Sequence, residues 1–283
     1  SSTMFAEVSS YVSIENLIRG IVIQSGNDAC IAIAEGISGS EDLFAIEMNF
    51  FTQKLGMKDS NFKNSTGLHH KEHYTSARDL VILAKALISD FPQYYHFFSE
   101  ENFTWNDIFQ PNRNNLLKDN IGVDGLKTGK TDQSGFSMIV SSFINQTRLI
   151  AVLGGLPSKE MRTSEMRKLI NYGQKAFKRS LVFKANQVID NVEVWGGEES
   201  FADLAVSDDI NLLLDIRGRR FLNARYLYNS PIAAPIKKGD TIGKIIILND
   251  DEIIIESNLI SNKDIDSSNF IKRAIDAMGY LFN

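Results

Sequence analysis

The sequence lacks several features that would assign it to a common class of protein. Cys30 is the only cysteine among 283 residues, which excludes intrachain disulfides and metal clusters held by several thiolates. No stretch approaches the roughly 18 consecutive apolar residues that a membrane-spanning helix needs. No run of Lys and Arg is present and the net charge is −5, so we do not expect a nucleic-acid-binding surface.

The remaining composition is typical of a folded protein of about two domains. Hydrophobic residues make up 43% of the chain and charged residues 23%, which are ordinary proportions for a globular protein. The first residues carry no basic segment followed by an apolar one, so no signal peptide is visible. We expect that the natural start of the protein has been removed, because a motif described below is missing.

Residues 1–178 combine helical and strand patterns and are predicted to form an α+β domain. Apolar residues recur at helical spacing in the first part of this region, and β-rich runs joined by a turn at Asn145-Gln146 follow later. One helix is expected after Ser13, a second over 28–35, a third ending at Gly56, a fourth after Thr75 or Ser76, and a last one over 163–178. The expected strands are 123–127, 136–143 and 148–153.

Residues 179–266 are predicted to form a small all-β domain, a sandwich or a barrel. The apolar run 253–255 is continuous, so we expect that strand to be covered on both faces. Residues 267–283 have an amphipathic helical pattern, and two readings stay open: the helix packs on its own domain, or it lies on a membrane surface. The expected strands are 188–194, 210–216, 221–228, 241–248 and 252–257.

A possible zinc motif occurs at 69–73, where the sequence His-His-Lys-Glu-His fits the pattern H-x-x-E-H. That chemistry requires both histidines on one face of a helix. Gly67 lies just before the motif and a helix cap at Thr75 or Ser76 lies just after it, so we expect a polar surface loop. No metal or other cofactor is predicted.

Two short motifs are weak separately but informative together. Ser25-Gly26-Asn27 lies between two apolar helices and by itself is explained by a helix cap and a turn. Lys127-Thr128-Gly129 ends a predicted strand and by itself is explained by a β-turn with a solvated lysine. Penicillin-interacting serine enzymes carry the elements S-x-x-K, S-x-N and K-T-G. The last two occur here in that order, 102 residues apart.

The sequence around both motifs resembles that of one family, and the resemblance extends along essentially the whole chain. The matching segments are 18–30, Leu55-Gly56-Met57, Gly67-Leu68, 75–79, 110–114 and 123–129. The family is the low-molecular-mass penicillin-binding proteins, serine-type D-alanyl-D-alanine carboxypeptidases of the bacterial envelope. The resemblance implies a transpeptidase-like fold in which an antiparallel sheet is flanked by helices, followed by a β-rich domain and a terminal helix.

The nucleophilic S-x-x-K element is missing from its place in the family pattern, which is several dozen residues before the S-x-N serine. One such string, 60–63, occurs in the chain, but it follows Ser25 and lies among turn-forming residues. The lysine must lie one helical turn from the serine to take its proton. We therefore expect that Ser60 and Lys63 are not the catalytic pair, and that the nucleophile segment is absent from this chain.

The resemblance implies a role for each of the remaining catalytic positions. The family reaction is acyl transfer through an acyl-serine, after which water hydrolyses the ester. Ser25 would relay a proton toward the leaving nitrogen, and Asn27 would hydrogen-bond the substrate amide. Lys127 would place a positive charge near the terminal carboxylate of the substrate and near Ser25.

The same resemblance implies the substrate-binding positions. Thr128 would offer its hydroxyl to the terminal carboxylate, Gly129 would let an extended peptide approach the strand, and the backbone N–H of Lys130 would donate to the oxyanion. A carboxypeptidase also needs a cation for a free C-terminus. Arg162 and Arg113 are candidates, with surface ion pairs as the alternative.

The expected partners are a peptidoglycan stem peptide ending in D-Ala-D-Ala, β-lactam inhibitors, and a membrane surface contacted by residues 267–283. The expected location is the periplasmic face of the bacterial inner membrane. Two other functions stay open. A serine β-lactamase shares K-T-G but usually has S-D-N at the second motif and lacks a β-rich second domain. A non-catalytic envelope module would bind a partner without chemistry.

Overall fold

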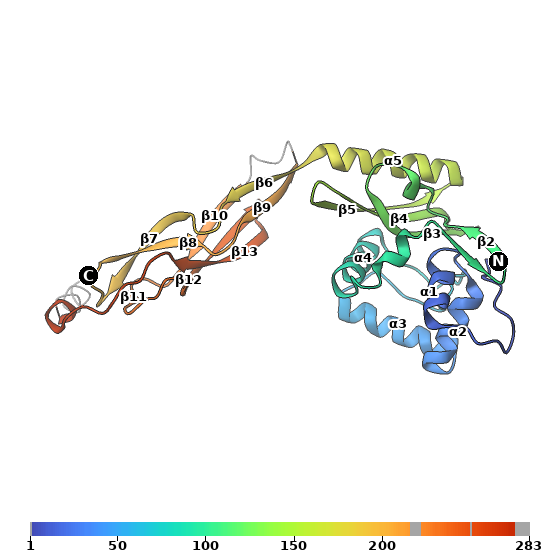
Figure 1. The fold of residues 1–283 in the computed structure, drawn as a ribbon, viewed down its shortest axis with the longest axis horizontal. Helices are drawn as coiled ribbons and strands as arrows, with labels where there is room; N and C mark the ends of the chain where they lie inside the picture. Colours follow the sequence, from blue (N-terminus) through green and yellow to red (C-terminus); the bar gives the residue numbers. More distant parts are fainter. Residues whose placement is uncertain (1, 216–221, 250, 275–283) are drawn as a thin grey trace. The chain divides into compact units, whose positions relative to one another are not determined.

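The computed structural model describes residues 2–215, 222–249 and 251–274. The chain divides into two compact units, Ser1–Gln174 and Lys175–Asn283. The first combines helices with an antiparallel sheet, and the second is built mainly of strands (Figure 1). The predicted fold class, α+β followed by all-β, is confirmed.

Serine side chains start three helices of the first unit, as their local patterns indicate. Ser13, Ser40 and Ser76 each accept a hydrogen bond from a backbone N–H in the first helical turn. The second helix is longer than predicted: it continues past Gly36 and ends at Gly39, whose φ of 80° closes the helix in the left-handed region. The helices are α1 (Ile14–Val22), α2 (Asn27–Ser38), α3 (Glu41–Leu55), α4 (Ala77–Asp90), the 3₁₀ helix η1 (Tyr95–Ser99) and α5 (Lys159–Ala176).

The sheet of the first unit has the order β3-β4-β5 and is antiparallel. Its strands are β3 (Val123–Thr131), β4 (Gly135–Ile144) and β5 (Thr147–Leu156). Asn145 and Gln146 have φ angles of 49° and 59°, so the predicted turn between the last two strands is confirmed. The hairpin β1 (Asn102–Trp105) and β2 (Ile108–Pro111) and the 3₁₀ helix η2 (Asn115–Lys118) were not predicted.

Helices cover both faces of this sheet, with α5 on one side and α4 on the other (Figure 1). Met166 and Ile170 of α5 are fully buried against Met138 and Val140 of β4. The prediction of a helix over 163–178 needs correction at both ends. The helix begins at Lys159, and strand β6 begins at Phe177, because its backbone pairs with β9.

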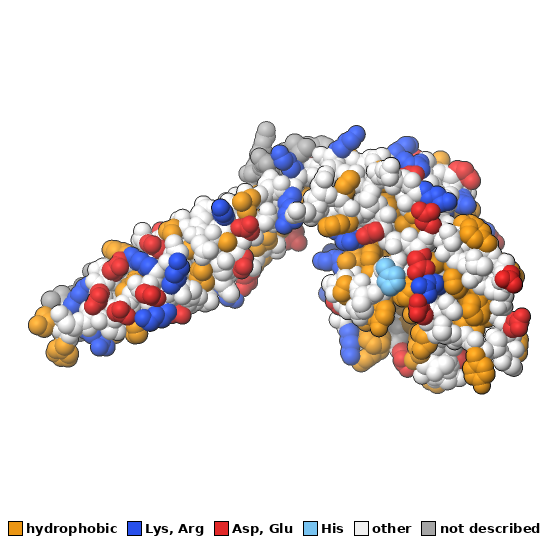
Figure 2. Space-filling view, in the orientation of Figure 1, with side chains coloured by type: hydrophobic (Ala, Val, Ile, Leu, Met, Phe, Trp, Pro, Cys, Tyr) orange, Lys and Arg blue, Asp and Glu red, His pale blue; other side chains and the backbone are white. Residues whose placement is uncertain are grey.

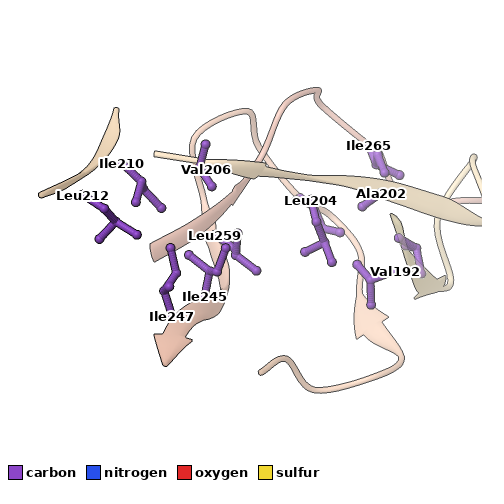
Figure 3. Close-up of a cluster of buried hydrophobic side chains, with 12 residues drawn as sticks. Val192, Ala202, Leu204, Val206, Ile210, Leu212, Ile245, Ile247, Leu259 and Ile265 are labelled. Atoms are coloured by element: carbon purple, nitrogen blue, oxygen red, sulfur yellow. The ribbon is translucent and has the colours of Figure 1, made fainter. Parts of the chain in front are cut away.

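The second unit has a six-stranded sheet of order β10-β12-β13-β8-β7-β11 and a two-stranded sheet of order β6-β9. Twelve buried residues form its core, and their side chains converge between the strands (Figure 3). Strands β6, β8 and β11 were missing from the sequence prediction. The strands are β6 (Phe177–Phe183), β7 (Val188–Trp195), β8 (Phe201–Val206), β9 (Ile210–Asp215), β10 (Leu222–Leu227), β11 (Ile232–Ala233), β12 (Thr241–Asn249) and β13 (Glu252–Ser261).

The apolar run 253–255 is not covered on both faces, so that prediction was wrong. Ile253 is 55% exposed and Ile254 is 39% exposed. They lie where β13 begins, next to its turn from β12, whereas the buried Leu259 lies near the other end of the strand. A continuous apolar run therefore does not identify a doubly covered strand at the end of a hairpin.

The visible face of the second unit carries charges of both signs. On the face shown in Figure 2, basic and acidic side chains lie beside each other rather than in patches of one sign. Two of the ion pairs join Lys244 to Glu256 at 2.6 Å and Lys237 to Asp266 at 3.2 Å.

The terminal helix predicted over 267–283 is described only in part. Residues 270–274 are helical, and residues 275–283 lie outside the described part of the chain. Within the described residues, no helix has the length and apolar character needed to cross a membrane.

Truncation of a buried core side chain tests the all-β unit. Ile245 is fully buried in the core, so Ile245→Ala should lower the free energy of unfolding by about 2–5 kcal/mol. The matched control Ile253→Ala, at a largely exposed position, should cost about 1 kcal/mol or less. Urea denaturation followed by circular dichroism measures both, and equal losses would contradict the core assignment.

Candidate active site

Ser25 and Lys127 lie in contact although 102 residues separate them in the sequence. The Lys127 amine donates a hydrogen bond to Ser25 Oγ at 2.7 Å and another to the Thr128 carbonyl oxygen at 3.0 Å. Ser25 follows the end of α1, and Lys127 lies in the middle of β3. The fold therefore brings the S-x-N serine and the K-T-G lysine to one place.

Backbone geometry places the Ser25 side chain at this point. Ser25 has a φ of 61°, a conformation that residues other than glycine adopt infrequently and at a cost. Its N–H donates to the Ile21 carbonyl and the next N–H donates to the Gly20 carbonyl, so the chain turns tightly before α2 begins. A Cβ on Gly26 would lie 2.8 Å from Asp28 Oδ1 and 3.0 Å from the backbone nitrogen of Met4, so this turn requires glycine.

Asp28 ties the N-terminal segment to the same turn. Its carboxylate accepts hydrogen bonds from Thr3 Oγ1 at 2.7 Å and from the N–H groups of Met4 and Ala6 at 2.9 and 3.1 Å. Burial by itself would raise the pKa of the Asp28 carboxyl, but these hydrogen bonds outweigh it and hold the pKa below its ordinary value. Sequence reasoning gave Asp28 no role, although an acidic residue in the first turn of a helix is a recognisable capping signal.

The environment of Lys127 favours its neutral form. Burial, together with the nearby charges of Arg113 and Arg162, lowers the pKa of its amine to about 8. Cys30, on α2, is close enough to interact electrostatically with Lys127, and burial raises the pKa of its thiol to about 11. The thiol is therefore neutral when the lysine titrates.

Two buried asparagines hold the loop that carries Arg113. Asn112 and Asn114 are 7% and 2% exposed. Asn112 Oδ1 accepts from the N–H of Asn114 at 2.9 Å, and Asn114 Nδ2 donates to the carbonyl of Gly125 at 2.9 Å. The loop is thus fastened to β3 two residues before Lys127. In the sequence these asparagines stand out only as part of the family resemblance, and their alternation around an arginine is the available signal.

Arg162 is a buried cation with an incomplete set of hydrogen bonds. It lies on α5 and is 4% exposed, and its Nε has no hydrogen-bond partner among the described residues. Its guanidinium carbon lies 5.9 Å from the centre of the Phe136 ring. Burial lowers its pKa, the charge of Arg113 lowers it further, and Glu160 opposes the change.

The two arginines and Lys127 form a cationic cluster. Each has a lowered pKa for which burial is the largest cause, and Lys127 and Arg162 are each lowered further by a neighbouring cation. Holding like charges close together, with Arg162 buried, is unfavourable unless an anion offsets them. The cluster is therefore suited to binding a carboxylate, and it brings together all three predicted cations.

Gly129 pairs with Ser137 of β4, and a Cβ at this position would lie 2.6 Å from Ser137 Oγ, so the Ser137 hydroxyl would have to turn away. Sequence reasoning had assigned the glycine to the approach of a substrate peptide. Its neighbour Thr128 is 8% exposed, and the Lys130 side chain forms an ion pair with Asp132. Strand β3, which carries these residues, is an edge strand in the described part of the sheet.

An apolar cavity of about 280 Å³ adjoins this part of β3. Leucines of α4 line it together with Lys127, Thr128 and Gly129 of β3. The polar groups of the site therefore border a non-polar space.

The remaining sequence candidates have separate environments. Asn27 begins α2, directly after the Ser25 turn, and its N–H donates to the Ser2 carbonyl at 2.9 Å. Ser60 Oγ donates to Asp79 Oδ2 at 2.7 Å, and Lys63 pairs with Glu72 at 3.3 Å. The Ser60 and Lys63 side chains are thus engaged with other partners.

The histidine motif lies outside helices, as predicted. Residues 69–73 precede α4, which begins after Ser76. His70 Nδ1 accepts from the N–H of Glu72 at 3.1 Å, and His73 Nδ1 accepts from the N–H of Lys63 at 3.3 Å. Among the described residues, no group of three His, Cys, Asp or Glu side chains is arranged to hold a metal.

The geometry places a serine–lysine contact beside two arginines, and comparison with known proteins shows the family of the chain. The sequence pattern described as D-alanyl-D-alanine carboxypeptidase matches residues 1–157, and that of the penicillin-binding protein 5 C-terminal domain matches residues 177–267. The chain belongs to the D-alanyl-D-alanine carboxypeptidase family, and the resemblance found in the sequence is confirmed.

Individual relatives cover almost the whole chain. The D-alanyl-D-alanine carboxypeptidase DacA of Escherichia coli K12 is 39% identical over 287 residues, which cover 100% of this chain and 71% of that protein. DacF of Bacillus subtilis is 33% identical, covering 98% of this chain and 73% of that protein. The crystal structure of penicillin-binding protein 5 from Haemophilus influenzae is 36% identical with a TM-score of 0.76, covering 94% of this chain and 78% of that one.

The electrostatic coupling within the cationic cluster can be measured directly. Arg113→Gln removes a positive charge near Lys127, so the pKa of Lys127 should rise from about 8 toward 10.5. An NMR titration of ¹³C-labelled lysine side chains measures this pKa. Arg78→Gln, at an exposed position in the first turn of α4, should leave it unchanged. An unchanged value in Arg113→Gln would remove Arg113 from the cluster.

Proposed function

We propose that this site takes part in releasing the terminal D-alanine from peptidoglycan stem peptides through an acyl-serine intermediate, whose serine is a residue other than Ser25, and that β-lactams acylate that other serine. The observation that carries the proposal is the 2.7 Å contact between Ser25 Oγ and the Lys127 amine, beside the buried Arg162 and the more exposed Arg113. A serine and a lysine of lowered pKa in contact can exchange a proton near neutral pH.

Arg162, Arg113 and Lys127 bind the free carboxylate of the substrate in this proposal. Arg162 is 4% exposed and Arg113 is more accessible, and a guanidinium can donate two parallel hydrogen bonds to a carboxylate. The unpaired Nε of Arg162 is available for one such bond. Thr128 offers its hydroxyl to the same carboxylate. This arrangement favours a peptide with a free C-terminus over an internal peptide bond.

Ser25 and Lys127 carry the proton toward the leaving D-alanine nitrogen. With a pKa of about 8, Lys127 can gain or lose a proton at neutral pH, and its hydrogen bond to Ser25 provides the path. Asn27, beside Ser25 at the start of α2, hydrogen-bonds the substrate amide.

Strand β3 aligns the substrate peptide. Its outer edge is available in the described part of the sheet, so an extended peptide can add to it as a further strand. Gly129 lies at the point of approach, and the N–H of Lys130 donates to the oxyanion that forms during acyl transfer.

The acylated serine and its lysine base are not among the residues of this chain in our proposal. The S-x-x-K string at 60–63 is engaged elsewhere: Ser60 is bonded to Asp79, and Lys63 pairs with Glu72. The chain by itself is therefore expected to bind substrate without completing the reaction.

The β-lactamase alternative is less well supported. The chain has Ser25-Gly26-Asn27 in place of S-D-N, and residues 177–267 match the C-terminal domain of penicillin-binding protein 5. A carboxypeptidase should form a long-lived adduct with penicillin, whereas a β-lactamase should turn it over rapidly.

We also propose that the protein works in the bacterial envelope, at the periplasmic face of the inner membrane, with residues 267–283 contacting the membrane surface. Phe270 and Ile271 are 84% and 70% exposed, which leaves apolar side chains available for such a contact.

Loss of the Lys127 amine should stop both reactions of the intact protein. Lys127→Ala should lower D-alanine release from a D-Ala-D-Ala peptide and acylation by penicillin at least about 100-fold, because proton transfer and carboxylate binding are both lost. Lys54→Ala, on α3, is the control and should retain activity. Unchanged rates in Lys127→Ala would exclude this lysine from the mechanism.

Removal of residues 267–283 tests membrane contact. The shortened protein should stay in the supernatant when sedimented with anionic lipid vesicles, whereas the unshortened protein should sediment with them. Equal sedimentation of both forms would show that this segment does not mediate binding.

A further inference from the structure

A polar network connects η1 to all three strands of the sheet. The Tyr95 hydroxyl donates to Asp124 Oδ1 on β3 at 3.1 Å. Arg148 of β5 binds the same carboxylate, with Nη1 2.9 Å from Oδ1 and 2.8 Å from Oδ2. It also donates to Ser141 Oγ on β4. Asp124, three residues before Lys127, is thus held from two sides.

The helix η1 lies directly on the backbone of β3. A Cβ on Gly125 would lie 2.7 Å from the Tyr95 hydroxyl oxygen and 3.4 Å from the Phe98 Cβ. Burial raises the pKa of Tyr95 to about 12, so its hydroxyl stays protonated and remains a hydrogen-bond donor throughout the neutral range.

The opposite side of η1 packs against the end of α1. Phe97 is 5% exposed and forms a buried cluster with Val22 and Ile23. The Arg19 guanidinium carbon lies 4.7 Å from the centre of the Phe97 ring. Ser25 follows Ile23 by two residues, so η1 lies between the element that ends at the serine and the strand that carries the lysine.

We propose that Tyr95 is a positioning residue that sets the contact between Ser25 and Lys127 by fixing η1 on β3. Its hydroxyl holds one side of η1 to Asp124 while Phe97 holds the other side to α1. The catalytic meaning of this contact rests on the proposed function, but the positioning itself is a property of the folded chain. Tyr95 touches neither Ser25 nor Lys127 in the contacts described above.

The consequence of loosening η1 is a change in the surroundings of Lys127. Ser25, Cys30 on α2, Arg113 on its loop and Arg162 on α5 face this amine. If α1 and β3 separate, water enters beside the amine and the pKa of Lys127 rises. Because the Tyr95 hydroxyl is neutral in the pH range where Lys127 titrates, replacing Tyr95 by Phe removes no charge.

The test measures the Lys127 pKa in Tyr95→Phe by NMR titration of ¹³C-labelled lysine side chains in the full chain. The expected result is a rise of about 0.3 or more above the unsubstituted value. Tyr94→Phe is the matched control, since Tyr94 is the neighbouring residue, caps η1 and is 55% exposed; it should leave the pKa unchanged. A Lys127 pKa that is the same in all three proteins would overturn the proposal.

Asp124→Asn provides a second variant that removes the other partner of the Tyr95 hydrogen bond. The Asp124 carboxylate is paired with Arg148 and is not among the groups that shift the pKa of Lys127, so losing its charge should by itself leave that pKa unchanged, whereas loosening of η1 raises it. A rise therefore supports positioning, and an unchanged pKa contradicts it. Circular dichroism of each variant shows whether it is folded, and the titration uses no substrate.

The two proposals can fail separately. If Tyr95→Phe changes the Lys127 pKa but the intact unsubstituted protein releases no D-alanine, positioning stands and the proposed function fails. If the unsubstituted protein is active, Tyr95→Phe should lower kcat and shift the pH profile upward with little change in KM. Unchanged kcat and pH profile would contradict positioning.

Discussion

The site depends on one buried amine held against one hydroxyl. Lys127 is surrounded by two arginines and desolvated, so its charged form is disfavoured and its pKa falls to about 8. The hydrogen bond to Ser25 is therefore made by a group that can change its protonation state near neutral pH. The same surroundings attract an anion, because a carboxylate would offset the repulsion among the three cations.

The fold maintains this arrangement with contacts to the backbone. Gly26 allows the tight turn at Ser25, Asp28 binds three groups of the N-terminal segment, and Asn114 fastens the Arg113 loop to β3. Such contacts restrict the movement of elements that lie far apart in the sequence. Buried side chains with all their hydrogen bonds made can keep Lys127 and the two arginines close together, although these cations repel one another.

Local signals in the sequence predicted the elements that depend on neighbouring residues. Ser13 and Ser76 start helices, and Asn145-Gln146 forms a turn, because each uses its own side chain or backbone conformation. The missed strands β6, β8 and β11 and the exposed Ile253 depend on partners elsewhere in the chain. Strand pairing and burial are set by those partners, so a local pattern does not identify them.

The sequence by itself determined the family, the order of the two motifs and the identity of the cations. Those features are carried by residue types and spacing, and they need no coordinates. Only the tertiary structure decided that Ser25 meets Lys127, that Arg162 is buried with an unpaired Nε, and that Ser60 is bonded to Asp79. The physical reason is that distances between remote segments arise from the packing of helices against the sheet, which acts on the whole domain at once.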